Sequence, residues 1–166
     1  MGKPAIRAAI YPGSFDPVTR GHLDLAHRAR RLFDRVTVAV LENPAKKSLF
    51  TVEERLHLLR QELADTDGFD IVSFQGLAVV LAASKGADWI VRGLRSAGDA
   101  ASEIPMAVSN RRCGDEEIET VFLPASPEVG FIASRLVREI TAGGGRLEPF
   151  VTPGVEAALR RKAGER

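Results

Sequence analysis

Short apolar segments alternate with amphipathic segments along the whole chain, and this alternation strongly limits the folds that the chain can adopt. The apolar segments are rich in β-branched residues or end at turn signals such as Pro12-Gly13, as expected for strands buried on both faces. Strands that alternate with helices form a parallel sheet with helices on both sides. The sequence therefore predicts an α/β fold with a doubly wound, five-stranded parallel sheet. The predicted strands are Ala5–Tyr11, Val36–Leu41, Ile71–Phe74, Trp89–Val91 and Thr120–Leu123.

The segments between the strands carry helix signals. Thr51 and Glu54 form a capping box before an apolar stripe, and Thr152-Pro153 opens a C-terminal helix at about residues 153–163. Pro105 is expected to bend its helix or to mark its first turn. The basic residues 160–162 are assigned to the dipole at the end of the last helix. The other predicted helices are those around Leu25–Phe33, Leu77–Ser84, Asp99–Arg112 and Arg135–Thr141.

Length, charge and cysteine content restrict the class of protein. The 166 residues are expected to form a single domain, residues 1–166. The 23 Lys and Arg against 22 Asp and Glu give no broad positive field, so neither nucleic acid nor a membrane surface is expected as a partner. Cys113 is the single cysteine, which excludes an internal disulfide, and it is expected to be a buried or half-buried filler. Because neither a membrane span nor a signal peptide is recognised, a cytoplasmic protein is expected.

In doubly wound sheets, ligands bind in the crevice at the carboxyl ends of the strands, where the strand order reverses. The loops after the first, second, fourth and fifth strands are therefore the places to search for a site. These loops are Tyr11–Gly21, Glu42–Phe50, Arg92–Gly98 and Pro124–Ser134.

The first of these loops leads into a helix whose first turn contains His22. The free N–H groups and dipole of a helix start attract phosphate, and an imidazole there can hydrogen-bond a phosphoryl oxygen. Gly13 and Gly21 allow close backbone approach, and Ser14 adds a hydroxyl. The alternative interpretation is that the glycines only form turns and that His22 is an exposed histidine at a helix start.

Two further loops carry pairs of cations. Lys46 and Lys47 follow the second strand, and Arg92 and Arg95 follow the fourth. Such residues are usually solvated or in surface ion pairs when they occur singly. At the carboxyl ends of strands in one sheet, they would together form a local site for a polyanion.

Three other polar residues receive structural interpretations. His27 and His57 fall within amphipathic helices and are expected on the surface. Asp16 is expected to cap a turn, with placement of a cation as the alternative.

Thr19-Arg20-Gly21-His22 matches the T/HxGH motif of the nucleotidylyltransferase superfamily, and the chain resembles the bacterial phosphopantetheine adenylyltransferases along nearly its whole length. The resemblance is carried by PGSFDPVTRGH, NPAKKSLFT with EER, RGLR and FIASRLVREI. It implies a Rossmann-like fold and the transfer of AMP from ATP to 4'-phosphopantetheine, giving dephospho-coenzyme A and pyrophosphate. It also implies Mg²⁺ as cofactor, a homohexamer, and coenzyme A as a candidate feedback inhibitor.

The resemblance further implies roles for individual residues. His22, Lys46 and Arg95 would be catalytic, with His22 stabilising the transition state. The residues implied to bind phosphopantetheine are Ser14, Lys46, Ala78 and Arg92. The residues implied to contact ATP are Ser14, Phe15, His22, Gly93, Leu94, Arg95, Glu103, Val129, Gly130, Phe131, Ile132, Ala133, Ser134 and Arg135. The metal ligands stay unassigned.

Two segments depart from the family pattern. Asp99–Glu103 reads DAASE where the family usually reads D-F/Y-E-Y-E, and Ala133–Arg135 reads ASR where it usually reads SSS or SST. The departures put pantetheine packing and nucleotide hydroxyl contacts in question, while Arg135 could add a phosphate contact. Two alternatives to the adenylyltransferase therefore stay open. One is another nucleotidylyltransferase, acting on nicotinamide mononucleotide or using CTP, and the other is a nucleotide- or coenzyme A-binding module without catalysis.

Overall fold

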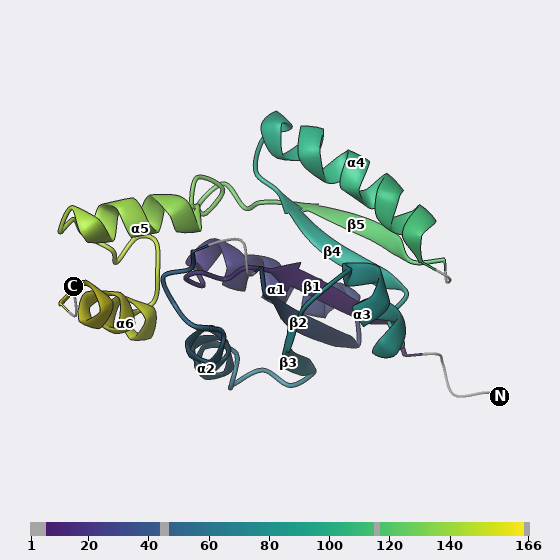
Figure 1. The fold of residues 1–166 in the computed structure, drawn as a ribbon, viewed down its shortest axis with the longest axis horizontal. Helices are drawn as coiled ribbons and strands as arrows, with labels where there is room; N and C mark the ends of the chain where they lie inside the picture. Colours follow the sequence, from purple (N-terminus) through teal and green to yellow (C-terminus); the bar gives the residue numbers. More distant parts are fainter. Residues whose placement is uncertain (1–5, 44–46, 115–116, 165–166) are drawn as a thin grey trace.

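A computed structural model of the protein describes residues 6–43, 47–114 and 117–164 (Figure 1). Within these ranges the chain forms one parallel sheet with the strand order β3-β2-β1-β4-β5, covered by helices, which confirms the predicted α/β doubly wound fold. The strands are β1 (Ala8–Gly13), β2 (Arg35–Leu41), β3 (Phe69–Phe74), β4 (Trp89–Leu94) and β5 (Glu119–Pro124). The helices are α1 (Arg20–Leu32), α2 (Val52–Glu62), α3 (Ala78–Ser84), α4 (Ala97–Cys113), α5 (Ser134–Ala142) and α6 (Pro153–Gly164).

The two faces of the sheet bury separate apolar clusters because successive strand side chains point to opposite sides. On one face, residues such as Val36, Val38 and Val40 of β2 pack with apolar residues of α1, α2, α5 and α6. On the other face, Ile10 and Ile90 pack with residues of α3. Helices α5 and α6 lie beyond one end of the sheet, away from the described N-terminal end of the chain (Figure 1).

A crevice opens between β1 and β4, where the strand order reverses. These two strands pair only at Ala9↔Trp89 and Ile10↔Ile90, and their later residues are not in register with each other. By contrast, β4 stays paired with β5 as far as Leu94↔Pro124. The carboxyl ends of β1 and β4 therefore diverge, as expected at the switch point of this fold.

Several predicted boundaries shift for identifiable reasons. β1 continues to Gly13, although the turn signal was expected to end it at Tyr11, because Pro12 and Gly13 still pair with Ala39 and Val40 of β2. Helix α4 starts at Ala97 because the Ser96 side chain accepts a hydrogen bond from the Asp99 N–H and caps it. Pro105 consequently lies inside α4 rather than in its first turn.

Helix α4 is unusual because none of its residues is buried. Ile104, Met106 and Val108 are each about half exposed, at 51%, 49% and 54%. Cys113, at the end of the same helix, is also exposed. The expectation of a buried or half-buried filler is therefore wrong, because α4 covers the sheet without being covered itself.

Two other side-chain expectations change. His27 is half-buried, and its ring packs edge-on against Phe69 with centroids 5.8 Å apart, so it is not a simple surface residue. The basic end of α6 makes specific ion pairs: Lys162 bonds Glu54 of α2 at 2.7 Å, and Arg160 bonds Glu156 at 3.1 Å. The Lys162 pair joins α6 to α2, whereas the Arg160 pair lies within α6, and both act in addition to any dipole effect. None of the described helices is both long and apolar enough to cross a membrane.

Candidate functional site

A cavity of about 380 Å³ occupies the crevice at the switch point. Its walls come from the end of β1 and the start of α1, from the end of β4, from the first turns of α4, and from the segment that leads into α5. The volume lies within the range typical of small-molecule sites. Segments far apart in the sequence thus meet where the sheet topology predicts a ligand.

The loop between β1 and α1 is held in an unusual backbone conformation. Phe15 has a φ of 47°, a left-handed value that is costly for a residue with a side chain, and it is only 1% exposed. Its ring lies edge-on to Tyr11 and to His22, at centroid distances of 5.3 and 5.1 Å. A Cβ at Gly13 would lie 2.9 Å from this ring, so a glycine is needed there. Packing of Phe15 therefore fixes the shape of the loop and one side of the histidine.

His22 belongs to the capping box of α1. The Thr19 hydroxyl accepts from the His22 N–H at 3.3 Å, and the Thr19 N–H donates to His22 Nδ1 at 3.1 Å. Burial, and to a lesser extent the positive charges of Arg95 and Arg92, together lower the pKa of His22 to about 4. The ring is therefore neutral near pH 7. Because Nδ1 accepts a hydrogen bond, the proton lies on Nε2, which can donate to a ligand.

Arg92 of β4 lines the cavity and reaches across to β1. Its guanidinium donates to both carboxylate oxygens of Glu103 at 2.7 and 2.5 Å, and also to the Pro12 carbonyl at 2.6 Å. Burial lowers the pKa of Arg92, but the bonds and charge of Glu103 outweigh this effect and raise it. Arg92 is therefore permanently charged, and its planar guanidinium is held in place by Glu103 of α4 and the Pro12 carbonyl of β1.

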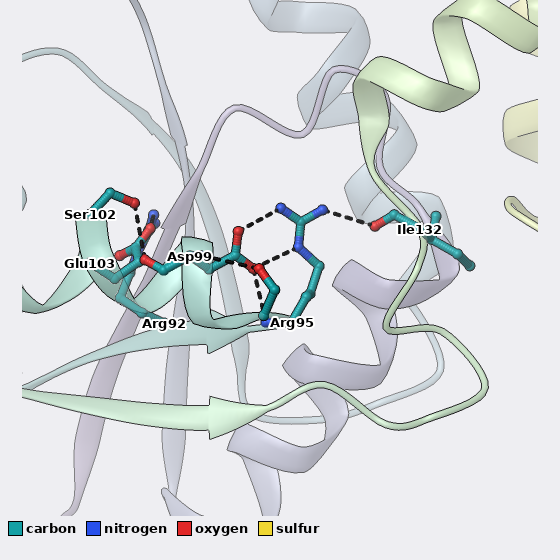
Figure 2. A network of polar contacts seen from close by, with 7 residues as sticks. Arg92, Arg95, Asp99, Ser102, Glu103 and Ile132 are labelled. Atoms are coloured by element: carbon teal, nitrogen blue, oxygen red, sulfur yellow. Dashed lines mark hydrogen bonds and ion pairs between the residues drawn. The ribbon is translucent and has the colours of Figure 1, made fainter.

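Arg95 is held by the first turn of α4 in the same manner (Figure 2). Its Nε and Nη2 donate to the Asp99 carboxylate at 3.0 and 3.1 Å, and its backbone N–H donates to the same group at 2.8 Å. Its Nη1 also reaches the Ile132 carbonyl at 3.3 Å, which links β4 to the loop before α5. Burial raises the pKa of Asp99, but the bonds from Arg95 dominate and lower it.

Helix α1 approaches β4 closely because Gly93 has no side chain. A Cβ at this position would lie 3.1 Å from Leu25 Cδ2. The start of α1, with its N–H groups, therefore lies beside the end of β4. This close approach places His22 and the two arginines around one cavity.

The segment that leads into α5 forms the opposite wall. Ala133 is the N-cap of α5 and makes no side-chain cap bond, so no side chain competes with a ligand for the first N–H groups of that helix. The Ser134 hydroxyl donates to the Pro17 carbonyl at 2.9 Å and ties α5 to the first loop. Arg135 pairs with Glu139 at 2.8 Å and is largely exposed at the cavity edge.

The structure brings most of the sequence-predicted site residues to this cavity. Those that line it are Ser14, His22, Arg92, Gly93, Arg95, Glu103, Val129, Ile132, Ala133, Ser134 and Arg135. The predicted residues that do not line it are Phe15, Ala78, Leu94, Gly130 and Phe131. Phe15 acts on the site through its contact with His22, Ala78 starts α3, and Phe131 packs on Phe150. Lys46 lies outside the described residues.

Sequence reasoning missed several residues of the cavity. Asp99 has no predicted role in the site, yet its carboxylate holds Arg95. Asp24 accepts from Ser126 Oγ at 2.8 Å and from Arg28 at 3.3 Å, and so joins α1 to the segment after β5. No spacing signal pointed to Asp24, because residues two apart in a helix do not share a face. Tyr11 also lines the cavity, and burial raises the pKa of its hydroxyl.

No built-in metal cage is found among the described residues: no group of three or more His, Cys, Asp or Glu side chains is arranged to hold an ion. The carboxylates at the cavity, Asp99, Glu103 and Asp24, are each bonded to an arginine. A magnesium ion in this cavity would therefore be carried largely by phosphate oxygens and water, which is a common mode of Mg²⁺ binding.

Comparison with known proteins places the chain in a family of nucleotide-using enzymes, which is consistent with a phosphate-binding cavity. Residues 10–140 match the cytidylyltransferase-like family. The chain is 48% identical over 154 residues to the phosphopantetheine adenylyltransferase of Gloeobacter violaceus, covering 93% of this chain and 95% of that protein. It is 46% identical to the enzyme of that name from Carboxydothermus hydrogenoformans (95% and 96% covered) and 48% identical to that from Chloroflexus aggregans (97% and 99% covered).

The fold is also shared with a solved structure from Vibrio parahaemolyticus that is described as a nicotinate-nucleotide adenylyltransferase. The TM-score is 0.70 over 95% of this chain and 93% of that one, at 16% sequence identity. At this identity the similarity establishes the fold alone. The near-full-length identities are more specific, and with them the chain is shown to belong to the phosphopantetheine adenylyltransferases, within the cytidylyltransferase-like family of nucleotidyltransferases.

Proposed function

We propose that the protein transfers AMP from ATP to 4'-phosphopantetheine, forming dephospho-coenzyme A and pyrophosphate. The observation that carries the proposal is the convergence of His22, Arg92 and Arg95 on one cavity at the switch point of the sheet. The chain has only a small net charge, so this cluster is a local feature suited to phosphate groups. Relatives named for this activity are 43–48% identical to it over nearly the whole chain.

The reaction needs no general base from the protein. A phosphate oxygen of the acceptor attacks the α-phosphorus of ATP, and the bond to the bridging oxygen of pyrophosphate breaks. The second pKa of a phosphomonoester is about 6, so the nucleophile is largely dianionic at pH 7. The protein must instead align two polyanions and stabilise the charge that develops on the transferred group.

The neutral His22 ring suits this task as a hydrogen-bond donor. Its Nε2–H would donate to an oxygen of the transferred phosphoryl group, while the Thr19 N–H holds Nδ1. Arg95 would contact the nucleotide phosphates, and Arg92 with Lys46 the acceptor phosphate. The open first turn of α5 would add backbone N–H groups on the nucleotide side.

Magnesium would enter with the nucleotide as a Mg·ATP complex. The described residues offer no separate metal cage, whereas triphosphate oxygens are good Mg²⁺ ligands. We therefore treat the metal as part of the substrate. The expected cytoplasmic location and inhibition by coenzyme A stay predictions.

A homohexamer remains the proposed assembly. It is supported by the exposed apolar residues of α4, because an apolar face of this kind on a soluble chain usually meets a partner. Ile104 and Val108, four residues apart on α4, provide that face. Light scattering that gives a monomer mass at micromolar concentration would contradict the assembly.

The activity is tested by measuring pyrophosphate release with Mg·ATP and 4'-phosphopantetheine. We expect turnover with this pair and much slower release with nicotinamide mononucleotide or with CTP in place of ATP. Faster pyrophosphate release with nicotinamide mononucleotide than with 4'-phosphopantetheine would show that the proposed acceptor is wrong. Tight binding of both substrates without pyrophosphate would instead establish a binding module.

A further inference from the structure

Asp16 is a buried carboxylate that the proposed transfer reaction does not use directly. Its side chain lies at the meeting point of three segments, and the residue is only 5% exposed. Oδ2 accepts from the Leu49 N–H and Oδ1 from the Phe50 N–H, both at 2.8 Å. Arg138 of α5 lies 3.6 Å from Oδ2 and also donates to the Asp16 carbonyl. Both oxygens of this buried carboxylate thus have hydrogen-bond partners, which indicates that Asp16 holds these segments together.

The bonded residues Leu49 and Phe50 end the loop between β2 and α2. Thr51, the next residue, is the N-cap of α2, and Phe50 is buried in the core. The same region is fastened a second time by Arg55, which is 4% exposed and donates to the Ser14 carbonyl at 2.9 Å. The end of the lysine-bearing loop is thus attached to the loop that leads to His22 at two neighbouring points.

We propose that Asp16 is a positioning residue, which sets the described end of the lysine-bearing loop (residues 47–50) against the His22 loop so that the acceptor phosphate is presented to the nucleotide. The inference rests on the proposed function, because it assigns the lysine-bearing loop to the acceptor. Lys47 stands two residues before Leu49, and Lys46 three residues before it. A shift of the loop end would therefore displace Lys47.

Only a carboxylate satisfies the two N–H groups together. Asparagine has one acceptor oxygen, and its NH₂ group would face the second N–H, donor against donor. Alanine leaves both N–H groups without this partner. Replacing Asp16 first by Asn and then by Ala therefore removes the hydrogen bonds from the Leu49 and Phe50 N–H groups one after the other.

The test compares wild type, Asp16→Asn and Asp16→Ala in the full-length protein, with Asp34→Asn as a matched control. Asp34 accepts from the Arg7 N–H at 2.8 Å and from its guanidinium at 3.2 Å, and it lies outside the cavity. We expect the KM for phosphopantetheine to rise about 10- to 100-fold across the series, because misplacement by about 1 Å can cost 10²-fold. The KM for Mg·ATP should change less than about threefold, and Asp34→Asn should change neither.

A second measurement does not depend on activity. Hydrogen exchange followed by mass spectrometry should show faster exchange at Leu49 and Phe50 in both Asp16 variants, and unchanged exchange there in Asp34→Asn. Equal rises in both KM values, or an unchanged phosphopantetheine KM in a variant with faster exchange, would overturn the positioning role. Unchanged exchange in both Asp16 variants would overturn the attachment itself. If wild type releases no pyrophosphate, the proposed function fails, and the exchange result still decides whether Asp16 holds the loop.

Discussion

The loop between β1 and α1 and the helix α4 face the same cavity but are stabilised in opposite ways. The loop buries Phe15 and Val18 at 1% exposure each and is bonded to both α2 and α5. Helix α4 has no buried residue and joins the site through the pairs Glu103–Arg92 and Asp99–Arg95 (Figure 2). The loop is therefore built by the core of one chain, whereas the position of α4 depends on charges and on whatever covers its outer face.

This difference suggests a division of roles. Groups that must be preorganised for charge stabilisation belong on the well-packed loop, because loosely held donors lose most of their effect. The cationic part of the site lies beside α4, where arginines are already neutralised by carboxylates. The following predictions test this division, from the largest expected effect to the smallest.

Replacing His22 should have the largest effect. We expect His22→Ala to fold and to bind ATP but to lose about 10² to 10³ in kcat, the typical cost of removing one such donor. Pyrophosphate release at saturating substrates measures the loss, and nucleotide binding is followed by calorimetry. His57→Ala is the control, because His57 is exposed on α2. A near-normal kcat would remove His22 from the mechanism and with it the special role of the first loop.

Acid should weaken the fold through the same histidine. The pKa of His22 is about 4 in the folded protein, against about 6.5 for an unperturbed histidine, so the unfolded chain binds more protons between these values. The contribution of His22 is fully present above pH 6.5 and is lost as the pH falls toward 4. It amounts to about 1–3 kcal/mol, since one pKa unit corresponds to about 1.4 kcal/mol.

Denaturant titrations at several pH values measure this dependence. His22→Gln should flatten the dependence between pH 6.5 and 4, whereas His57→Gln should leave it unchanged. A wild-type slope that persists in His22→Gln would show that other groups cause it. The buried loop would then not be the acid-sensitive region.

Changes on α4 should affect the folded chain least. Substituting Ile104 or Val108 by serine should alter the stability of the isolated subunit by no more than about 0.5 kcal/mol, because exposed positions make few contacts. Circular dichroism should show an unchanged fold, while light scattering should show a lower mass if this face joins subunits. Loss of the fold at unchanged mass would contradict the division between the two regions.

Much of the site could be predicted from local sequence signals. The position of the first loop followed from an apolar strand, a Pro-Gly turn and a helix start, all of which depend on neighbouring residues. Arg92 and Arg95 were found because they follow a strand that ends at the ligand-binding edge of the sheet, and His22 because Thr19-Arg20-Gly21-His22 resembles the T/HxGH motif. The exposure of Cys113 and the edge-on contact of His27 with Phe69 could not be predicted, since they depend on which helix faces are covered.

By itself, the sequence determined the order of strands and helices, the parallel sheet and the edge at which a ligand would bind, because hydrophobic period and turn residues act locally. Only the tertiary structure decided that Arg92 and Arg95 are paired with acids of α4, that Thr19 leaves the His22 proton on Nε2, and that Asp16 holds the end of a distant loop. These features join residues distant in the sequence or depend on side-chain orientation. Hydrogen-bond geometry and burial fix them, and neither can be read from spacing along the chain.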